Sequence, residues 1–432
     1  MNEFPPRYDQ SKEPELYQKW EQSGAFKPSG KGKPFSMVLP PPNVTGSLHV
    51  GHAVVVAIED LMVRYHRMKG DNTLWIPGVD HAAIATQSVV EKKIRKEKDL
   101  TRYQLGREAF LKEVDEFVAT TKDRILTQIR SLGASLDWSR LAYTLDEPRS
   151  LAVRTIFKQM SDAGILYRGN RIVNWCPRCQ STLSDDEVEY REETTPFYYF
   201  KYGPVVIGTA RPETKFLDKT IVVHPDDVRY KKLIGQTITV EWIDGPVSAT
   251  VIADPVVNPE FGTGAMTITP AHSFEDFDLA QRHNLSVPLI INEYGKLTEA
   301  AGEFAGQKAR DARAGIVEKL EAKGLVEKID ENYTHNLSIC YRCSTPIEPL
   351  PKLQWFVAVS KPFRDGKSLK DLMLAAVESG DGDTSEVNRA INTSEVKETL
   401  ESSKIRILPD RYTKVYHHWI HNLLDWCISR QI

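Results

Sequence analysis

The sequence predicts a mixed α/β fold in which a mainly β domain is inserted into a domain built on a parallel sheet. An apolar strand, a helix and a second strand follow one another between residues 35 and 76. Farther along, two Cys-x-x-Cys pairs flank a long stretch of short β-branched and aromatic runs. A chain of 432 residues is too long for one hydrophobic core. We therefore predict three segments, residues 1–190, 191–335 and 336–432, of which the middle one is the insertion.

The first predicted strand leads through a proline-rich loop into a helix. The strand covers Phe35 to Leu39, and the helix begins near His49, three residues before His52. Residues three apart share one helix face, and the unpaired amides and positive dipole at a helix start attract anions. Gly51 would let a flat ring or a phosphate approach the backbone. The pattern favours a phosphate-binding site, although two histidines at a helix start also occur as ordinary surface or packed residues.

A second strand completes one strand–helix–strand unit. The first helix is predicted to end at Gly70, and the second strand covers Thr73 to Ile76. In parallel sheets, ligands bind beyond the carboxyl ends of the strands. Asp80 and His81 follow the second strand, so we expect them where a substrate would lie. Asp80 also suits a helix N-cap, and that role does not exclude contact with a ligand.

Four of the five cysteines form two knuckles of the type Cys-x-x-Cys. They are Cys176 with Cys179, and Cys340 with Cys343. Without a secretion signal, paired knuckles indicate a tetrahedral zinc site rather than disulfides. The large separation indicates that a whole domain lies between the halves and that zinc joins its two ends in a ribbon-like junction. Four thiolates leave no open position for water, so the predicted Zn²⁺ is structural. Cys427 lies in an apolar stretch and is predicted to be buried packing.

The stretch between the knuckles has the composition of an all-β barrel or sandwich. Its short runs are separated by turn residues, and they cover residues 197–202, 205–209, 220–224, 237–242 and 265–269. One helix is expected from Asp276 to His283, and a longer one around Gln307 to Ala322. Both helices would pack against the strands.

Composition excludes some classes of protein. Hydrophobic residues make up 41% and charged residues 27%, as in soluble globular proteins. The apolar run from Ala53 to Ile58 is far too short to cross a membrane, and the first six residues resemble no secretory or mitochondrial leader, so we predict a cytoplasmic protein. A net charge of −3 gives no overall attraction to nucleic acid. Local basic runs such as Lys92–Lys98 could supply it, but such a run is also typical of a solvated helix face.

Long motifs along the chain closely resemble valyl-tRNA synthetases, which are class I enzymes with a Rossmann-type nucleotide-binding domain. The motifs are Pro40-Pro-Pro-Asn-Val-Thr-Gly-Ser-Leu-His-Val-Gly-His52, Gly78-Val-Asp-His-Ala-Ala-Ile-Ala-Thr-Gln87, Leu132-Gly-Ala-Ser-Leu-Asp-Trp-Ser-Arg140, Arg211-Pro-Glu-Thr214, Phe261-Gly-Thr-Gly264, Thr269-Pro-Ala-His272 and Asp425-Trp-Cys-Ile-Ser-Arg-Gln431. Isoleucyl and leucyl relatives share the fold but differ before the first histidine and at Arg-Pro-Glu-Thr. The resemblance therefore implies valine as substrate, with isoleucine a distant second.

This resemblance implies ATP-dependent activation of valine and its transfer to tRNA(Val) by a monomer. His49 and His52 would contact the phosphates of ATP, which arrives with Mg²⁺, and Gly51 would admit the adenine. Asp80 would pair with the valine ammonium, and Pro41 and Asn43 would close the amino-acid side of the site.

The inserted domain is implied to be an editing domain that hydrolyses mischarged Thr-tRNA(Val). A pocket shaped for valine cannot strongly reject threonine, which has nearly the same volume, so a second site is needed. Thr209, Arg211 and Thr214 would bound that pocket, and Asp276 would hold the substrate ammonium. Asp276 could equally cap a helix, and the two roles can coexist.

Three positions depart from the family pattern in the implied editing pocket. Where the family usually has a threonine, a lysine and an aspartate, this chain has Ala210, Thr267 and Ser273. These changes would remove a hydroxyl, a positive charge and a negative charge. We expect them to weaken editing or to alter its discrimination.

Other family elements are absent from this sequence. It has no Lys-Met-Ser-Lys-Ser loop, no second half of the nucleotide fold and no helical anticodon-binding domain, and a polar segment at about residues 379–404 resembles a solvated insertion. Three hypotheses remain open: part of a valine ligase that needs the remaining half, a stand-alone editing hydrolase, or a tRNA-binding fragment without activity.

Overall fold

The computed structural model describes residues 7–377 and 405–432, and it divides into two compact units. The first comprises Met1–Lys158 with Ile432, and the second comprises Gln159–Gln431. The predicted polar insertion at residues 379–404 lies outside the described residues. Among the described helices, none has the length and apolar character needed to cross a bilayer.

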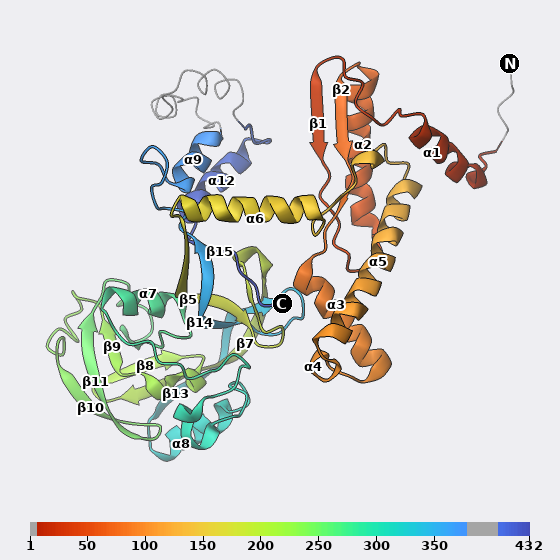
Figure 1. Cartoon of the computed structure of the whole chain (residues 1–432). Coiled ribbons are helices and arrows are strands. Elements are labelled where there is room, and N and C mark those ends of the chain that lie inside the picture. Colours follow the sequence, from red (N-terminus) through yellow and green to blue (C-terminus); the bar gives the residue numbers. More distant parts are fainter. Residues whose placement is uncertain (1–6, 378–404) are drawn as a thin grey trace, which may run out of the picture. The chain divides into compact units, whose positions relative to one another are not determined.

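The first unit contains the predicted strand–helix–strand motif. Strand β1 (Pro34–Val38) pairs in parallel with β2 (Asn72–Ile76), and α2 (Val50–Met68) joins them (Figure 1). Gly70 follows α2 with a left-handed φ of +87°, the conformation that ends a helix most easily at glycine. A short parallel pair, β3 (Gly78–Val79) and β4 (Ala142–Tyr143), continues from β2. The parallel α/β prediction for this region is confirmed.

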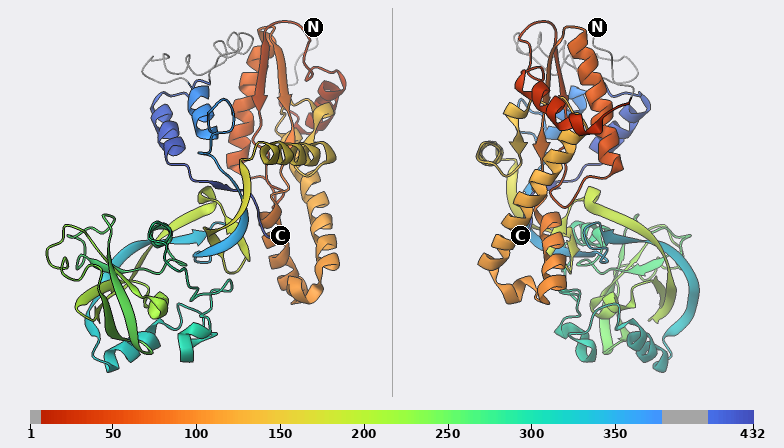
Figure 2. Two further views of the ribbon diagram at one scale, coloured as in Figure 1. Left: turned by 60° about the vertical axis from the view of Figure 1, so that its left-hand side comes forward. Right: turned by 90° about the vertical axis from the view of Figure 1, so that its right-hand side faces the viewer.

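Helices surround these strands. They are η1 (Gln10–Lys12), α1 (Glu13–Gln22), α3 (Ala83–Lys98), α4 (Arg102–Leu105), α5 (Arg107–Ser131) and η2 (Trp138–Arg140). Helix α6 (Glu147–Asp162) buries none of its residues and contains the boundary at Lys158. Both views of Figure 2 show α3 and α5 lying side by side. The core of the unit forms around Trp75 of β2, Val63 of α2 and Ile125 of α5, all fully buried.

The second unit begins with a four-stranded sheet of order β15-β14-β5-β6. Its strands are β5 (Leu166–Cys176), β6 (Ser181–Leu183), β14 (Glu348–Val357) and β15 (Trp426–Cys427), and η3 (Asp185–Glu187) follows β6. Two helices, α9 (Leu369–Ala376) and α12 (Arg411–His421), contact each other.

Two long strands carry the chain into and out of the predicted insertion. Strand β7 (Val188–Tyr202) pairs antiparallel with β13 (Val326–Cys340), and the long curved pair is visible in Figure 2. Glu193 lies opposite His335, so the predicted boundaries at residues 190 and 335 lie close together on neighbouring strands. The boundaries themselves stay a prediction, because both fall within continuous strands of one unit.

The middle of the insertion is mainly β. Strand β8 (Val205–Thr209) joins β7, and a separate sheet has the order β10-β11-β9-β12. Its strands are β9 (Thr220–Val223), β10 (Thr237–Trp242), β11 (Gly245–Ala253) and β12 (Ala265–Thr267). The sequence reading missed β11, whose exposed positions carry proline and serine. Phe200, Tyr202 and Trp242 are fully buried between the sheets.

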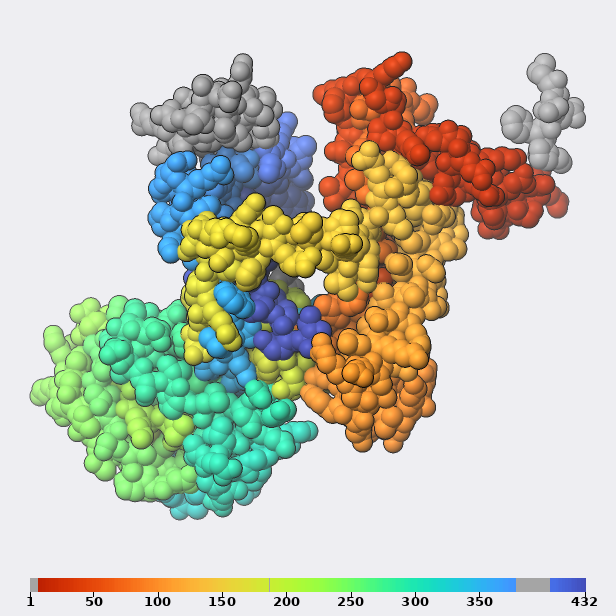
Figure 3. Space-filling model, in the orientation of Figure 1, coloured from red at the N-terminus to blue at the C-terminus, as the bar shows by residue number. Residues whose placement is uncertain are grey.

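Short helices pack around these sheets. They are η4 (Pro212–Leu217), α7 (Phe274–Arg282), η5 (Glu299–Phe304) and α8 (Arg313–Ala322). Helix α8 begins six residues later than the predicted Gln307, because Lys308 forms a bridge with Lys296 and residues 309–312 form turns. In the space-filling view, the green and cyan atoms of these segments pack into one body (Figure 3).

Candidate functional site

The two histidines at the start of α2 lie against each other. His49 is the N-cap, and its Nδ1 accepts a hydrogen bond from the Gly51 amide at 3.1 Å. His52 Nδ1 accepts from the His49 amide at 3.3 Å, and the ring centroids are 4.0 Å apart. Because each Nδ1 is an acceptor, each neutral ring carries its proton on Nε2. Burial and the nearness of His49 lower the pKa of His52.

Gly51 leaves room for the ring of His49. A Cβ at this position would lie 2.9 Å from Cε1 of the His49 ring, which is too close. In this structure the group that approaches the glycine backbone is therefore the ring of His49 itself. The glycine makes the histidine cap possible.

The predicted amino-acid-binding residues Asn43 and Asp80 are brought together. They form a parallel bridge, in which the Val44 amide donates to the Asp80 carbonyl and the Asp80 amide to the Pro42 carbonyl, both at 2.9 Å. The Asp80 carboxylate accepts from the Ala82 amide at 3.0 Å and from the Thr144 hydroxyl at 2.8 Å. The N-cap of α3 is Ala82, so Asp80 supports the helix start without being its cap. Pro41, which precedes the bridge, is exposed.

The four predicted metal ligands form one cluster. The Sγ atoms of Cys176, Cys179, Cys340 and Cys343 all lie within 4.8 Å of one another, and the Cys343 sulfur is 3.5 Å from Cys176 and 3.6 Å from Cys179. Four thiolates around a tetrahedral Zn²⁺, with Zn–S bonds of about 2.3 Å, would be spaced by about 3.8 Å. The donor set and spacing therefore fit zinc. Hydrogen bonds from the thiols of Cys176 and Cys179 lower the pKa of Cys343.

The Arg-Pro-Glu-Thr motif forms η4 at the end of β8. Thr209 accepts a hydrogen bond from the Arg211 amide at 2.9 Å, and Thr214 donates to the Arg211 carbonyl at 2.9 Å. Pro212 stands in the first turn, where its fixed φ suits a helix start. Three of the predicted editing residues therefore lie together where β8 leads into η4. The fourth, Asp276, lies on α7.

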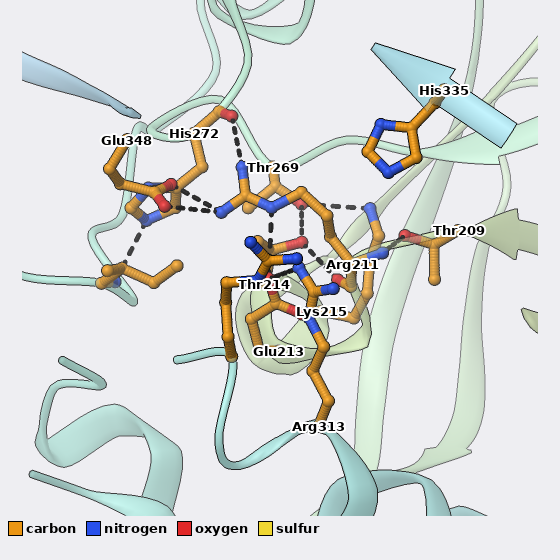
Figure 4. A network of polar contacts seen from close by, with 12 residues as sticks. Thr209, Arg211, Glu213, Thr214, Lys215, Thr269, His272, Arg313, His335 and Glu348 are labelled. Carbon is orange, nitrogen blue, oxygen red and sulfur yellow. Dashed lines mark hydrogen bonds and ion pairs between the residues drawn. The ribbon is translucent and has the colours of Figure 1, made fainter. Parts of the chain in front are cut away.

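The Arg211 side chain is held by groups that are distant in sequence. Its Nη2 donates to both carboxylate oxygens of Glu348 at 2.7 Å, and its Nε donates to Glu213 at 3.2 Å (Figure 4). Burial alone would lower the pKa of Arg211, but the two carboxylates outweigh burial and raise it. Burial raises the pKa of Glu348, but Arg211 and His272 together outweigh burial and lower it, which favours the ionised carboxylate.

His272 completes this charged group, which we call the Arg211 cluster: Arg211, Glu213, His272, Arg313 and Glu348. The His272 Nε2 accepts from the Ile290 and Ile291 amides at 3.2 and 3.1 Å, so the neutral ring carries its proton on Nδ1. That atom lies 3.1 Å from Glu348 Oε1, although the bond is poorly aligned. Arg313 donates to Glu213 at 2.7 and 2.8 Å.

Asp276 is buried in the first turn of α7, and its contacts differ from those of a cap. The N-cap is Ser273, whose hydroxyl accepts from the Asp276 amide at 3.3 Å. The Asp276 carboxylate accepts from the Thr269 amide at 2.8 Å. Burial raises the pKa of Asp276, while nearby Lys215 opposes that change.

Lys215, Asp218 and Thr269 connect the η4 turn to Asp276. The Lys215 ammonium donates to Asp218 at 2.9 Å and to the Thr269 hydroxyl at 3.1 Å. The Thr269 hydroxyl donates to the other oxygen of Asp218 at 2.9 Å, and it lies 3.5 Å from the Thr214 hydroxyl. The sequence reading missed Lys215 and Asp218, although both adjoin the Arg-Pro-Glu-Thr motif.

The three positions that depart from the family pattern lie around this group. Ala210 precedes Arg211, and Ser273 is the cap of α7. Thr267 is buried on β12, and its hydroxyl has no hydrogen-bond partner among the described residues. A cavity of about 450 Å³ opens beside Ala210 and Arg211, whereas Thr214 and Asp276 are not among its lining residues.

Comparison with known proteins identifies the family. The model of the class I tRNA synthetases (I, L, M and V) matches residues 15–432. The chain is 43% identical to a valine–tRNA ligase of Thermotoga maritima, with 100% of this chain and 47% of the relative covered. It is 43% identical to that of Pseudothermotoga lettingae (97% and 46%) and 42% identical to that of Synechocystis sp. (99% and 44%).

The chain thus spans about half the length of the curated relatives it matches. The family model covers nearly all of it, including the histidine motif at α2, the four cysteines and the η4 turn. The chain belongs to the class I tRNA synthetases of the isoleucine, leucine, methionine and valine group, and its relatives are valine–tRNA ligases.

Proposed function

We propose that this chain is part of a valine–tRNA ligase and carries two sites, one for activation of valine and one for editing. The observation that supports the activation site best is the bridge between Asn43 and Asp80 in the unit that contains His49 and His52. It places a carboxylate on the segment that follows β2, beside the loop that precedes α2. A carboxylate there suits the ammonium of an amino acid, and the start of α2 suits phosphate.

In the proposed reaction, the carboxylate of valine attacks the α-phosphate of ATP and displaces pyrophosphate. A hydroxyl at the tRNA(Val) 3′ end then takes the valyl group from the adenylate, and AMP leaves. Phosphoryl transfer needs positioning and charge stabilisation rather than covalent help from the protein. His49 and His52 would donate from Nε2 to phosphate oxygens, and Asp80 would hold the valine ammonium. Mg²⁺ would arrive with ATP as part of the substrate and would offset the negative charge of the phosphates.

Ligand titration by calorimetry tests this site in the chain as it stands. We expect His49→Ala with His52→Ala to weaken binding of Mg²⁺–ATP by about tenfold or more, since each would remove a charge-assisted hydrogen bond. Asp80→Ala should abolish valine binding and leave ATP binding in place. Lys69→Ala, at the opposite end of α2, is the matched control. Equal affinities in all four proteins would contradict the proposal.

The editing site would consist of the η4 turn with Asp276. Thr214 and Thr269 offer hydroxyls, and the Asp276 carboxylate suits the α-ammonium of an aminoacyl ester. Hydrolysis of a mischarged ester would then supply the discrimination between valine and threonine that one pocket cannot.

Deacylation measures this second activity directly. The chain should release threonine from Thr-tRNA(Val) faster than valine from Val-tRNA(Val), and Asp276→Ala should lose that release. Folded protein that releases neither amino acid above a buffer control would exclude editing by this chain.

The four-cysteine cluster would hold a structural Zn²⁺. The ion would fix the ends of β5 and β13, because each strand contributes one cysteine of its knuckle. It would supply no catalytic step, since all four positions around it are taken by sulfur.

A further inference from the structure

Lys215 is a buried lysine whose ammonium uses all three of its protons. It is 8% exposed on η4 and donates to Asp218 at 2.9 Å, to the Thr269 hydroxyl at 3.1 Å and to the Thr267 carbonyl at 3.4 Å. Figure 4 shows Lys215 beside Thr214 and Thr269. A buried ammonium with three acceptors is held in one place, because each lost partner would leave a desolvated charge.

The partners of Lys215 belong to both halves of the proposed editing site. Asp218 follows η4 directly, whereas Thr269 belongs to the segment between β12 and α7. Thr269 also donates its amide to Asp276. One lysine therefore fixes the segment that aligns the Asp276 carboxylate with the η4 turn.

The charge of Lys215 matters as much as its contacts. Asp218 and Asp276 are both buried, and two carboxylates in one buried region destabilise each other's ionised form. Glu275, beside Asp276 on α7, adds a further negative charge. The positive charge of Lys215 compensates these buried carboxylates. Its electrostatic attraction lowers the pKa of Asp276 and so favours the ionised form.

The positive charge comes from a different position than the family resemblance implies. The family resemblance places a lysine at position 267, where this chain has a threonine with an unpartnered buried hydroxyl. The Lys215 ammonium instead comes from η4 and contacts the backbone carbonyl of that same residue. The positive charge expected to be lost at Thr267 is therefore present.

We infer that Lys215 is a positioning residue of the editing site: by holding Asp218, Thr269 and the Thr267 carbonyl, it keeps Asp276 fixed and ionised to bind the α-ammonium of an aminoacyl ester. This inference rests on the proposed editing function. Lys215 has no proton left for the substrate, so it acts through Asp276 and is not itself a catalytic residue.

The test compares Lys215→Met with Lys215→Met/Thr267→Lys, which returns the cation from β12. The first readout needs no activity: the carboxyl carbon of Asp276 is titrated by NMR. Lys215→Met should raise the pKa of Asp276 by about one unit, and the double variant should restore it. An unchanged pKa in Lys215→Met would overturn the inference, whether or not the wild type hydrolyses the ester.

Hydrolysis of Thr-tRNA(Val) is the second readout. We expect Lys215→Met to raise KM about tenfold, with recovery in the double variant and in Lys215→Arg. The neutral pair Lys215→Met/Asp218→Asn covers the case in which Lys215→Met alone does not fold, and wild-type hydrolysis in that pair would contradict the inference. If the wild type is inactive while the pKa of Asp276 responds as expected, the proposed function fails and the placement of Lys215 stands.

Discussion

At the scale of single residues, the Arg211 cluster explains how a charged turn is kept rigid in a buried place. Glu348 accepts two hydrogen bonds from one guanidinium and lies beside the Nδ1 proton of His272. Glu213 accepts hydrogen bonds from both Arg211 and Arg313. Every charge in the cluster has an opposite neighbour, so burial does not leave any of them uncompensated.

Replacing Glu348 by glutamine tests this arrangement. We expect Glu348→Gln to lower the free energy of unfolding at pH 7 by about 1–3 kcal/mol, because it removes the charge from a pair of hydrogen bonds to Arg211. Urea denaturation measures the difference. Glu327→Gln is the matched control, since its partner Lys201 and Glu327 itself are about half exposed and such pairs contribute little.

The same comparison has a defined pH dependence. The pKa of Glu348 is lower in the folded protein than its ordinary value of 4.5, so its stabilising effect is complete above that value. The effect is lost as the pH falls through the lower folded pKa. The difference between wild type and Glu348→Gln should therefore shrink in acid, and a difference that grows below pH 4.5 would show that Glu348 is not the ionised partner.

At the scale of elements, the start of α7 assigns the helix cap and the proposed site residue to two different side chains. Ser273 caps the helix, which leaves the Asp276 carboxylate available to the Thr269 amide outside it. The start of α2 uses a histidine cap in the same way, and Gly51, two residues after it, carries no side chain that would clash with the His49 ring. In both helices the cap fixes the direction of a polar side chain in the first turn.

Removal of the Ser273 hydroxyl should loosen α7. Ser273→Ala is expected to cost about 1 kcal/mol of stability, the usual effect of losing a helix cap. Ser273→Asp, which restores the residue typical of the family, should retain the cap because aspartate caps as well as serine. Thermal unfolding monitored by circular dichroism distinguishes them, and equal midpoints for the alanine and aspartate variants would mean that the cap contributes nothing.

At the scale of the whole molecule, the cysteine cluster closes a long loop of the second unit. It brings Cys176 and Cys343, 167 residues apart, to a sulfur–sulfur distance of 3.5 Å. Strand β14 starts five residues after Cys343 with Glu348, the partner of Arg211. The metal site and the proposed editing turn are therefore linked through one short segment of chain.

Metal removal provides the corresponding prediction. The purified chain should contain one Zn²⁺, and chelation should lower its unfolding midpoint by roughly 5–10 °C, because a tightly bound ion stabilises only the folded state. Cys343→Ser should show the lower midpoint without chelator. Cys427→Ser is the control, since Cys427 lies outside the cluster. A metal-free wild type with an unchanged midpoint would contradict a structural zinc.

Much of the fold could be read from local patterns. The parallel strand–helix–strand unit, the β-rich insertion and the four-cysteine cluster all have signals that lie within a few residues: apolar periodicity, turn residues and the knuckle spacing. His49 and His52 were singled out by a local pattern of the same kind, whereas Thr209, Arg211 and Thr214 followed only from the resemblance to a known family. Strand β11 was missed because its exposed face carries residues that are rare in strands.

The tertiary structure decided which charges meet. The sequence around Arg211 does not predict Glu348 as its partner, because Glu348 lies 137 residues away. The two residues meet because β14 pairs with β5. From the sequence alone, Lys215 would likewise be predicted as a surface lysine. Its ammonium can be buried only because Asp218, Thr267 and Thr269 provide hydrogen-bond acceptors. The sequence by itself determined the family and the local motifs, because these depend on neighbouring residues. Long-range packing determined the electrostatic partners, because charges act through space and not along the chain.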